Sequence, residues 1–226
     1  LWEYIRENVP EAVGDGSIYF YMNIYNGGLH ALRQGEILGR DRIDIQEIMI
    51  VPVGAKNYSQ ALEMGDRIDQ ELKKILEASF EKSNISRADE AGFSVKGLGS
   101  STEAIGYVVE AIRNAGYQPG TDVKLALDPA ATSFYDAEKG VYNFQGQVLD
   151  ADGMIRYYRD LVDTYPGIFI SIEDGLAEDD WEGWQKSTAE MTNHGVITIG
   201  EDLFVTQLGR LTRVIENEAA TAILIK

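Results

Sequence analysis

Apolar runs recur along the chain and predict six β-strands. Two come early, at residues 17–24 (SIYFYMNI) and 43–53 (IDIQEIMIVPV), and both are rich in β-branched and aromatic side chains. Four shorter runs follow, at residues 123–127, 168–172, 196–199 and 222–225. These later runs are mostly apolar, which is typical of strands that are buried on both faces of a sheet.

Helical patterns fill the intervals between the runs. In residues 58–81, apolar side chains recur at the spacing of one helix face. A second helix is predicted to begin at Ser100, where Glu103 completes a Ser-x-x-Glu capping box, and to end before Gly116. Three further helices are predicted at residues 150–165, 178–192 and 206–218. The polar stretch between the first two strands, which carries Arg33, Arg40, Asp41 and Arg42, is predicted to be an exposed loop.

Strands that alternate with helices indicate an α/β fold with a parallel sheet. A doubly wound nucleotide-binding sheet would need a Gly-rich turn after its first strand, and the one candidate, residues 97–100 (GLGS), follows no clear strand. A (β/α) barrel places its chemistry at the carboxyl ends of its strands. Here four successive strands end on a charge, at Asp128, Glu173, Glu201 and Lys226. The barrel explains all four and is the preferred interpretation.

Three carboxylates on one edge of a barrel would form an all-oxygen site, which suits Mg²⁺. A lysine on the next strand would lie beside that cation, whose charge would lower the lysine pKa and favour the neutral amine, a possible base. A metal with a lysine suits removal of a proton next to a carboxylate. The alternative is structural, because an acidic residue after a strand is often a helix N-cap. Spacing alone leaves both interpretations open.

Composition narrows the class of protein. The net charge of −17 argues against nucleic-acid binding and against anionic membranes, and an anionic substrate would need a metal or lysines to reverse the local field. The absence of cysteine excludes disulfides, thiolate metal sites and a cysteine nucleophile, and it is compatible with a cytoplasmic location. No apolar run is long enough to span a bilayer, and no signal peptide opens the chain.

Five segments in order carry a more specific signal. They are residues 22–31 (MNIYNGGLHA), 45–55 (IQEIMIVPVGA), 89–93 (DEAGF), 171–181 (SIEDGLAEDDW) and 223–226 (ILIK). Each resembles a motif of the enolase (phosphopyruvate hydratase) family, and together they span nearly the whole chain. The resemblance implies a lyase that dehydrates 2-phosphoglycerate to phosphoenolpyruvate in glycolysis and gluconeogenesis.

The resemblance also implies roles at matching positions. Asp128, Glu173 and Glu201 would hold Mg²⁺. Lys226 would be the base that takes the C2 proton of 2-phosphoglycerate. Glu90 would be the acid that helps the C3 hydroxyl to leave. Without the motif, Glu90 would be interpreted as a solvated loop carboxylate.

Three further residues are implied to touch the substrate or to position Glu90. These are His30, Gln46 and Glu47. The alternative for His30 is a histidine buried in a Gly-rich turn, and for Gln46 and Glu47 it is pairing at the surface of an edge strand.

The implied fold is the family's ββαα(βα) barrel, incomplete, with about six of its eight strands. Residues 1–12 would be the end of an N-terminal capping domain, and residues 13–226 a truncated catalytic TIM-type barrel. The family implies a homodimer or a multiple of dimers at full length, and a cytoplasmic location.

The chain departs from the family pattern near the expected metal. Glu201 stands where the family has aspartate, so its longer side chain must retract to hold the ion, and Asp202 is a possible substitute. Ser133 stands where the family usually has glutamate.

Two other departures concern loops at the mouth of the site. Ala91 replaces a glycine, and if that glycine has a positive φ, alanine would shift Glu90. His30 and Glu47 are separated by about eight more residues than is common.

The chain begins within a helical pattern and ends directly after an apolar run, so we expect a fragment that lacks the residues gripping the phosphate and has little turnover alone. One alternative is a divergent, non-catalytic paralog that binds a partner or serves a structural role. Another is a related acid-dehydrating enzyme, which the motifs around His30 and Glu90 disfavour.

Overall fold

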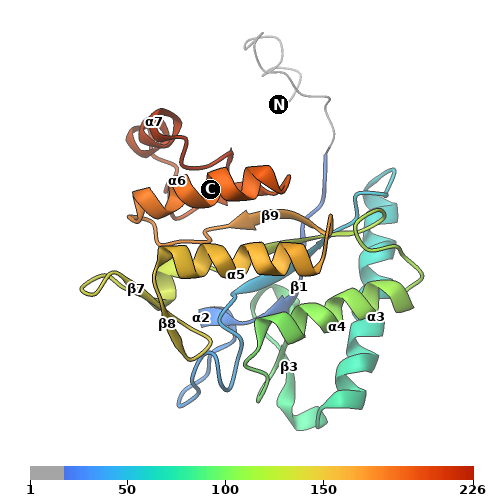
Figure 1. Ribbon diagram of the computed structural model, residues 1–226. Helices are drawn as coiled ribbons and strands as arrows, with labels where there is room; N and C mark the ends of the chain where they lie inside the picture. Colours follow the sequence, from blue (N-terminus) through green and yellow to red (C-terminus); the bar gives the residue numbers. More distant parts are fainter. Residues whose placement is uncertain (1–17) are drawn as a thin grey trace.

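The computed structural model describes residues 18–226 (Figure 1). The predicted remnant of a capping domain, residues 1–12, and the first residue of the first predicted strand lie outside this range. Eight strands form one sheet in the order β11-β10-β9-β5-β2-β1-β4-β3. The strands are β1 (Met22–Asn26), β2 (Glu47–Val51), β3 (Ile85–Arg87), β4 (Phe93–Val95), β5 (Lys124–Asp128), β9 (Phe169–Glu173), β10 (Ile197–Gly200) and β11 (Ala222–Ile223).

The six predicted strands lie side by side, in chain order, as β1, β2, β5, β9, β10 and β11. Within residues 18–226 the sheet keeps two edges, β11 and β3, so it is an unclosed part of a barrel, as the sequence predicted. Three of the six strands differ from their predicted bounds by more than one residue, and the second, predicted at residues 43–53, is shorter at both ends. The first strand begins at Met22, opposite Ile50, because Pro52 follows β2 and has no N–H to extend the ladder. The last strand is assigned only to Ala222–Ile223.

Among the six predicted strands, one runs against the others. The strands β5, β9, β10 and β11 are parallel, whereas β2 is antiparallel to both β1 and β5. The amino end of β2 therefore lies at the same edge of the sheet as the carboxyl ends of its neighbours. We call this edge the rim.

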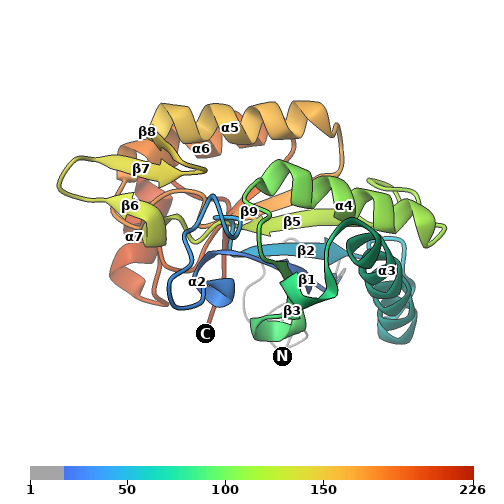
Figure 2. The ribbon, with the colours of Figure 1, turned by 90° about the horizontal axis from the view of Figure 1, so that it is seen from below.

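Helices cover one face of the sheet, as Figure 2 shows for α3, α4 and α5. The helices are α2 (Gly28–Ala31), α3 (Tyr58–Ser79), α4 (Ser101–Asn114), α5 (Ala151–Thr164), α6 (Trp181–Asn193) and α7 (Leu208–Asn217). The five predicted helices are confirmed, with ends that differ by up to three residues. Ser100 accepts a hydrogen bond from the N–H of Glu103, which confirms the predicted N-cap.

Strand periodicity separates the two faces of the sheet. Ile48 and Ile50 of β2 face the helices in the large core, together with Leu125 and Leu127 of β5. The alternate residues Met49, Val51 and Ala126 form a smaller apolar cluster on the other face, the inside of the barrel. At the rim end of these strands, the side chains on the inner face therefore point into the mouth of the barrel.

Two short β elements were missed by the sequence analysis. One is the hairpin of β3 and β4, which attaches to β1. The other is a separate three-stranded sheet of β6 (Tyr135–Asp136), β7 (Val141–Phe144) and β8 (Gln147–Leu149).

The prediction of an exposed loop after the first strand was wrong for Arg42. Its side chain is only 3% exposed and pairs with Glu36, whose side chain is 8% exposed. Arg33 and Arg40 are exposed, as predicted.

Candidate active site

Strand direction brings three carboxylates to one part of the rim. Asp128 is the last residue of β5, and Glu173 is the last residue of β9. Glu47 is the first residue of β2 and lies directly opposite Asp128, because β2 runs in the reverse direction. All three are buried residues.

The loops after β1 and before β4 bring two more predicted residues to the rim. His30 lies in α2, directly after the Gly27-Gly28 turn. A Cβ at Gly27 would lie 2.3 Å from the Ile43 side chain, so only glycine fits there. Glu90 precedes β4, whose Phe93 lies beside Tyr25 near the end of β1.

All eight predicted site residues line one cavity of about 480 Å³. They are His30, Gln46, Glu47, Glu90, Asp128, Glu173, Glu201 and Lys226. Tyr21, Met49, Ile199, Ile223 and Leu224 complete its wall. Lys226 is the only lysine or arginine lining this cavity within residues 18–226.

Close contacts link several of these side chains. The His30 Nδ1 and the Glu47 Oε1 are 3.3 Å apart. The Lys226 Nζ lies 2.6 Å from the Glu201 Oε1. The Asp128 Oδ1 accepts a hydrogen bond of 2.9 Å from the N–H of Ala130, which fixes that carboxylate at the strand end.

The carboxylates of the rim repel one another in a dehydrated setting. Burial, followed by the charges of Asp174 and Glu201, raises the pKa of Glu173 to about 8. Burial and the charge of Glu173 hold the pKa of Asp128 well above its usual range. Burial and the charge of Glu90 raise the pKa of Glu47 to about 7. Negative charge is thus costly here, and perturbations of this kind are common at functional sites.

Comparisons with known proteins identify the family of the chain. Residues 19–226 match the family model described as "Enolase, C-terminal TIM barrel domain". The chain belongs to the enolase family. It is 42% identical over 205 residues to the Enolase of Corynebacterium kroppenstedtii and 45% identical over 205 residues to the Enolase of Natranaerobius thermophilus. Each alignment covers 91% of this chain and 45% of the relative, so the chain spans about half the length of the curated relatives it matches.

Asp174 is a site residue that the sequence analysis missed in this enolase-family chain. Its buried carboxylate accepts hydrogen bonds from the N–H groups of Glu201 and Asp202, at 3.1 and 2.9 Å, and of Leu203 at 3.4 Å. It therefore anchors the loop after β10. The signal was its position directly after Glu173, but its role depends on the neighbouring strand, which the sequence does not place.

Two overlapping groups of carboxylates can offer oxygens within 4.8 Å of one another. One is Asp128, Glu173 and Asp174, and the other is Asp174, Glu201 and Asp202. Asp128 and Glu173 thus come together as predicted, while Glu201 groups with Asp202, the residue considered as its substitute. An all-oxygen, negatively charged and buried group of this kind fits a divalent cation such as the one expected for enolases.

Lys226 was expected to have a lowered pKa when a cation lies beside it. The hydrogen bond from its Nζ to Glu201, followed by further carboxylate charges, raises the pKa of Lys226. The expected lowering rests on the positive charge of a cation beside Lys226 and stays a prediction for the metal-bound protein.

The other departures from the enolase pattern have different consequences. Ala91 has a φ of +62°, and Glu90 itself has a φ of +55°, so the turn that presents Glu90 is left-handed at two non-glycine residues. Ser133 is exposed in a short 3₁₀ turn (Ala131–Phe134) and does not line the cavity.

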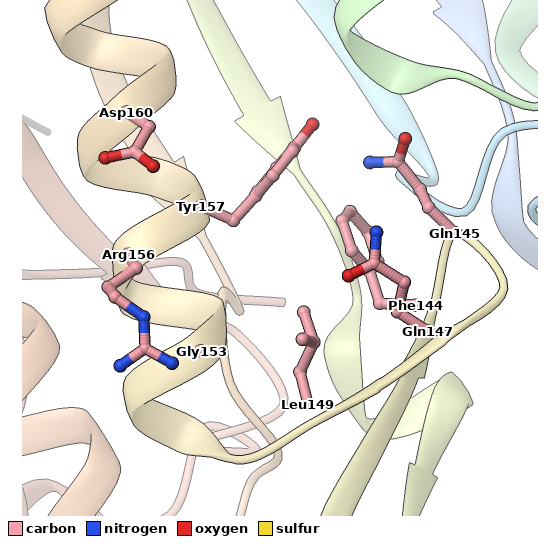
Figure 3. Close-up of a pocket in the computed structure, with 8 residues that line it drawn as sticks. All are labelled: Phe144, Gln145, Gln147, Leu149, Gly153, Arg156, Tyr157 and Asp160. Carbon is pink, nitrogen blue, oxygen red and sulfur yellow. The ribbon is translucent and has the colours of Figure 1, made fainter.

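A second cavity of about 420 Å³ lies outside the barrel, between the β7–β8 hairpin and α5. Figure 3 shows Gly153, Arg156, Tyr157 and Asp160 from α5 on one side. Phe144, Gln145, Gln147 and Leu149 come from the hairpin. It contains none of the predicted site residues.

Among residues 18–226, no helix has both the length and the apolar character needed to cross a membrane.

Proposed function

We propose that this chain is the barrel part of a Mg²⁺-dependent enolase, a lyase that dehydrates 2-phosphoglycerate to phosphoenolpyruvate in glycolysis and its reverse. The observation that carries the proposal is the convergence of all eight predicted side chains on one cavity. Membership of the enolase family and the curated relatives named Enolase support the same reaction.

The proposed metal ligands are Asp128, Glu173 and Glu201. Burial and neighbouring carboxylates raise the pKa of Asp128 and Glu173, which supports a site for a cation. When bound, Mg²⁺ would offset the negative charge that develops on the substrate carboxylate during proton removal. The neighbouring Asp174 holds the Glu201 loop through the backbone.

The proposed base is Lys226, whose Nζ would take the proton from C2 of 2-phosphoglycerate. It must first be a neutral amine, and its ion pair with Glu201 at 2.6 Å opposes that state. Lys226 therefore acts as a base only when the charge of Glu201 is engaged elsewhere. This coupling ties proton removal to an occupied carboxylate site.

The proposed acid is Glu90, which would give a proton to the C3 hydroxyl so that it leaves as water and the C2–C3 double bond forms. Glu47 lines the same cavity as Glu90. Burial, followed by the charge of Glu90, raises the pKa of Glu47 to about 7. Glu47 therefore retains a proton more readily than an exposed glutamate near neutral pH. His30 and Gln46 would orient the substrate against this pair.

The proposal extends to the assembled protein. On the likeness to enolases, we propose a homodimer or a multiple of dimers at full length and a cytoplasmic location. Sedimentation of the full-length protein tests the oligomeric state.

Calorimetry on the 226-residue chain tests the function at its site. We expect Mg²⁺ to bind and 2-phosphoglycerate to bind only after it, because the substrate is anionic and the cavity walls are acidic. Glu173→Gln should remove Mg²⁺ binding, whereas the control His194→Gln, on a different surface, should retain it. Absence of Mg²⁺ binding to the unaltered chain would overturn the proposal and favour the non-catalytic interpretation. Phosphoenolpyruvate formation by the full-length protein, followed by ultraviolet absorbance, then tests the chemistry, because we expect little turnover from the 226-residue chain alone.

A further inference from the structure

The segment between α2 and β2, residues 32–46, begins and ends at the rim. The N–H of Gly27 donates to the carbonyl of Gln46 at 3.0 Å, and the N–H of Gly28 donates to that of Ile43 at 2.9 Å. These bonds close the segment into a loop whose two ends carry His30 on one side and Gln46 and Glu47 on the other. Whatever fixes the shape of this loop also fixes the spacing of these side chains.

The far part of this loop has little apolar burial to hold it. None of the side chains from residue 32 to residue 41 belongs to the hydrophobic core, and Ile37 is 53% exposed. A loop without a core keeps one shape only if polar contacts hold it.

A buried ion pair provides that contact. The Arg42 Nε donates to the Glu36 Oε2 at 2.9 Å, and its Nη2 donates to the Glu36 Oε1 at 3.2 Å. Because the contact is bidentate, it fixes the orientation of both planar groups as well as their distance. Lys96 adds a weaker contact, with its Nζ 3.9 Å from the Glu36 Oε1.

The remaining guanidinium nitrogen of Arg42 contacts a residue outside the loop. Its Nη1 donates to the hydroxyl of Ser94 in β4 at 2.9 Å. Ser94 lies four residues after Glu90, and Ala88 and Gly92 close the intervening turn by a backbone hydrogen bond of 2.9 Å. One guanidinium therefore joins the loop that carries His30, Gln46 and Glu47 to the hairpin that carries Glu90.

A separate contact ties the same loop to the three-stranded sheet. The buried carboxylate of Asp44 accepts a hydrogen bond of 2.8 Å from the N–H of Gln145, at the tip of the β7–β8 hairpin. This contact attaches the loop to a second element, separate from β4.

We propose that Arg42 is a positioning residue that sets the register of the His30–Glu47 group against the Glu90 turn through its contacts with Glu36 and Ser94. The assignment of substrate roles to the positioned residues rests on the proposed function, but the coupling itself does not. Arg42 does not line the cavity and touches no substrate.

Nuclear magnetic resonance of the two histidines of the chain tests this coupling without substrate or metal. The double variant Glu36→Gln/Arg42→Met removes both charges, so that no unpaired buried charge is left to unfold the protein. We expect the ring ¹⁵N resonances of His30 to shift or broaden, while those of His194, paired with Asp163 on another surface, stay unchanged. Arg40→Met, at an arginine whose side chain is 71% exposed, is the matched control and should change neither.

Amide exchange extends the test to Glu90. Ser94→Ala keeps the ion pair and removes only the hydrogen bond from Arg42 to β4, while the N–H of Gly97 still donates to the carbonyl of Asp41 at 2.8 Å. We expect amides of residues 88–92 to exchange about tenfold faster while α5 is unaffected. A folded double variant with unchanged His30 resonances, or a folded Ser94→Ala variant with unchanged exchange at residues 88–92, would overturn the proposal. Failure of the unaltered chain to bind Mg²⁺ would overturn the proposed function and leave these two results to be judged separately.

Discussion

Two groups of buried charge lie in this chain and are treated in opposite ways. In the first, Arg42 and Glu36 meet as a bidentate ion pair and Ser94 completes the contact. In the second, the carboxyl groups of Asp128, Glu173 and Asp174 lie together. Burial raises the pKa of Glu173 to about 8 and that of Asp174 to about 6. Burial is similar, since all of these side chains are nearly inaccessible.

The difference separates structure from function. A compensated buried pair favours one arrangement of the chain. The intact pair adds little net stability, but loss of one partner is strongly destabilising. Repulsion within a like-charged group destabilises the fold. Such a group is therefore better explained by a function, such as binding a ligand of opposite charge. The rim carboxylates are interpreted as a site, and the Arg42 group as its support.

Breaking the compensated pair should have the largest effect. Arg42→Met leaves the buried Glu36 carboxylate with only the N–H of Arg33 at 3.2 Å and the distant Nζ of Lys96 at 3.9 Å, and we expect it to lower the free energy of unfolding by about 3 kcal/mol. Urea denaturation measures this change. Arg40→Met should change the same quantity by less than about 0.5 kcal/mol, since that side chain is exposed. Equal losses in the two variants would contradict the comparison.

Removing one carboxylate from the rim should instead raise the free energy of unfolding. The pKa of Glu173 is raised to about 8, so the folded state binds this proton more tightly than the unfolded state and loses stability as pH rises from about 4.5 to about 8. At pH 7 with a chelator, Glu173→Gln should stabilise the chain by on the order of 2 kcal/mol. Added Mg²⁺ should raise the melting temperature of the unaltered chain and not that of the variant. A destabilised variant would show that the rim charge supports the fold.

Asp44 tests whether a hydrogen bond alone compensates a buried carboxylate. Burial raises its pKa to about 6 although Gln145 donates to it. The unaltered chain should therefore lose stability, relative to Asp44→Asn, as pH rises from about 4 to about 6, by on the order of 1–2 kcal/mol. Thermal unfolding of both chains across this range measures the difference. Parallel pH profiles would show that Asp44 is fully compensated.

The smallest effect is expected at the turn that presents Glu90. Ala91 has a φ of +62°, which glycine adopts without strain, so Ala91→Gly should raise the free energy of unfolding by about 1 kcal/mol. Ala88→Gly, at a φ of −109°, is the matched control and should bring no gain. A gain in both variants would show that the gain at Ala91 does not come from relief of its positive φ.

Much of the fold was predictable because its strands are long apolar runs and its helices are amphipathic. The strand ends at Asp128 and Glu173 followed from the same pattern, and the enolase motifs supplied His30, Gln46, Glu47 and Glu90. The β3–β4 hairpin was missed because each strand has only three residues, too few to show a period.

Contacts between distant segments could not be predicted in this way. The burial of Arg42 depends on Ser94, which is 52 residues away, and the role of Asp174 depends on backbone groups 27 to 29 residues away. A polar residue in a polar stretch is predicted to be exposed unless its partner is known. The pairing of Lys226 with Glu201 likewise depends on strand order and not on local sequence.

The reversed direction of β2 has a consequence for how the protein can change during evolution. Because β1 ends and β2 begins at the rim, the connection between them never crosses to the other end of the barrel. Residues inserted there alter only the surroundings of the site, and the closure entropy of a longer loop rises slowly with its length. This connection is therefore a place where new specificity can be tried by insertion while the strands that carry Asp128 and Glu173 stay the same.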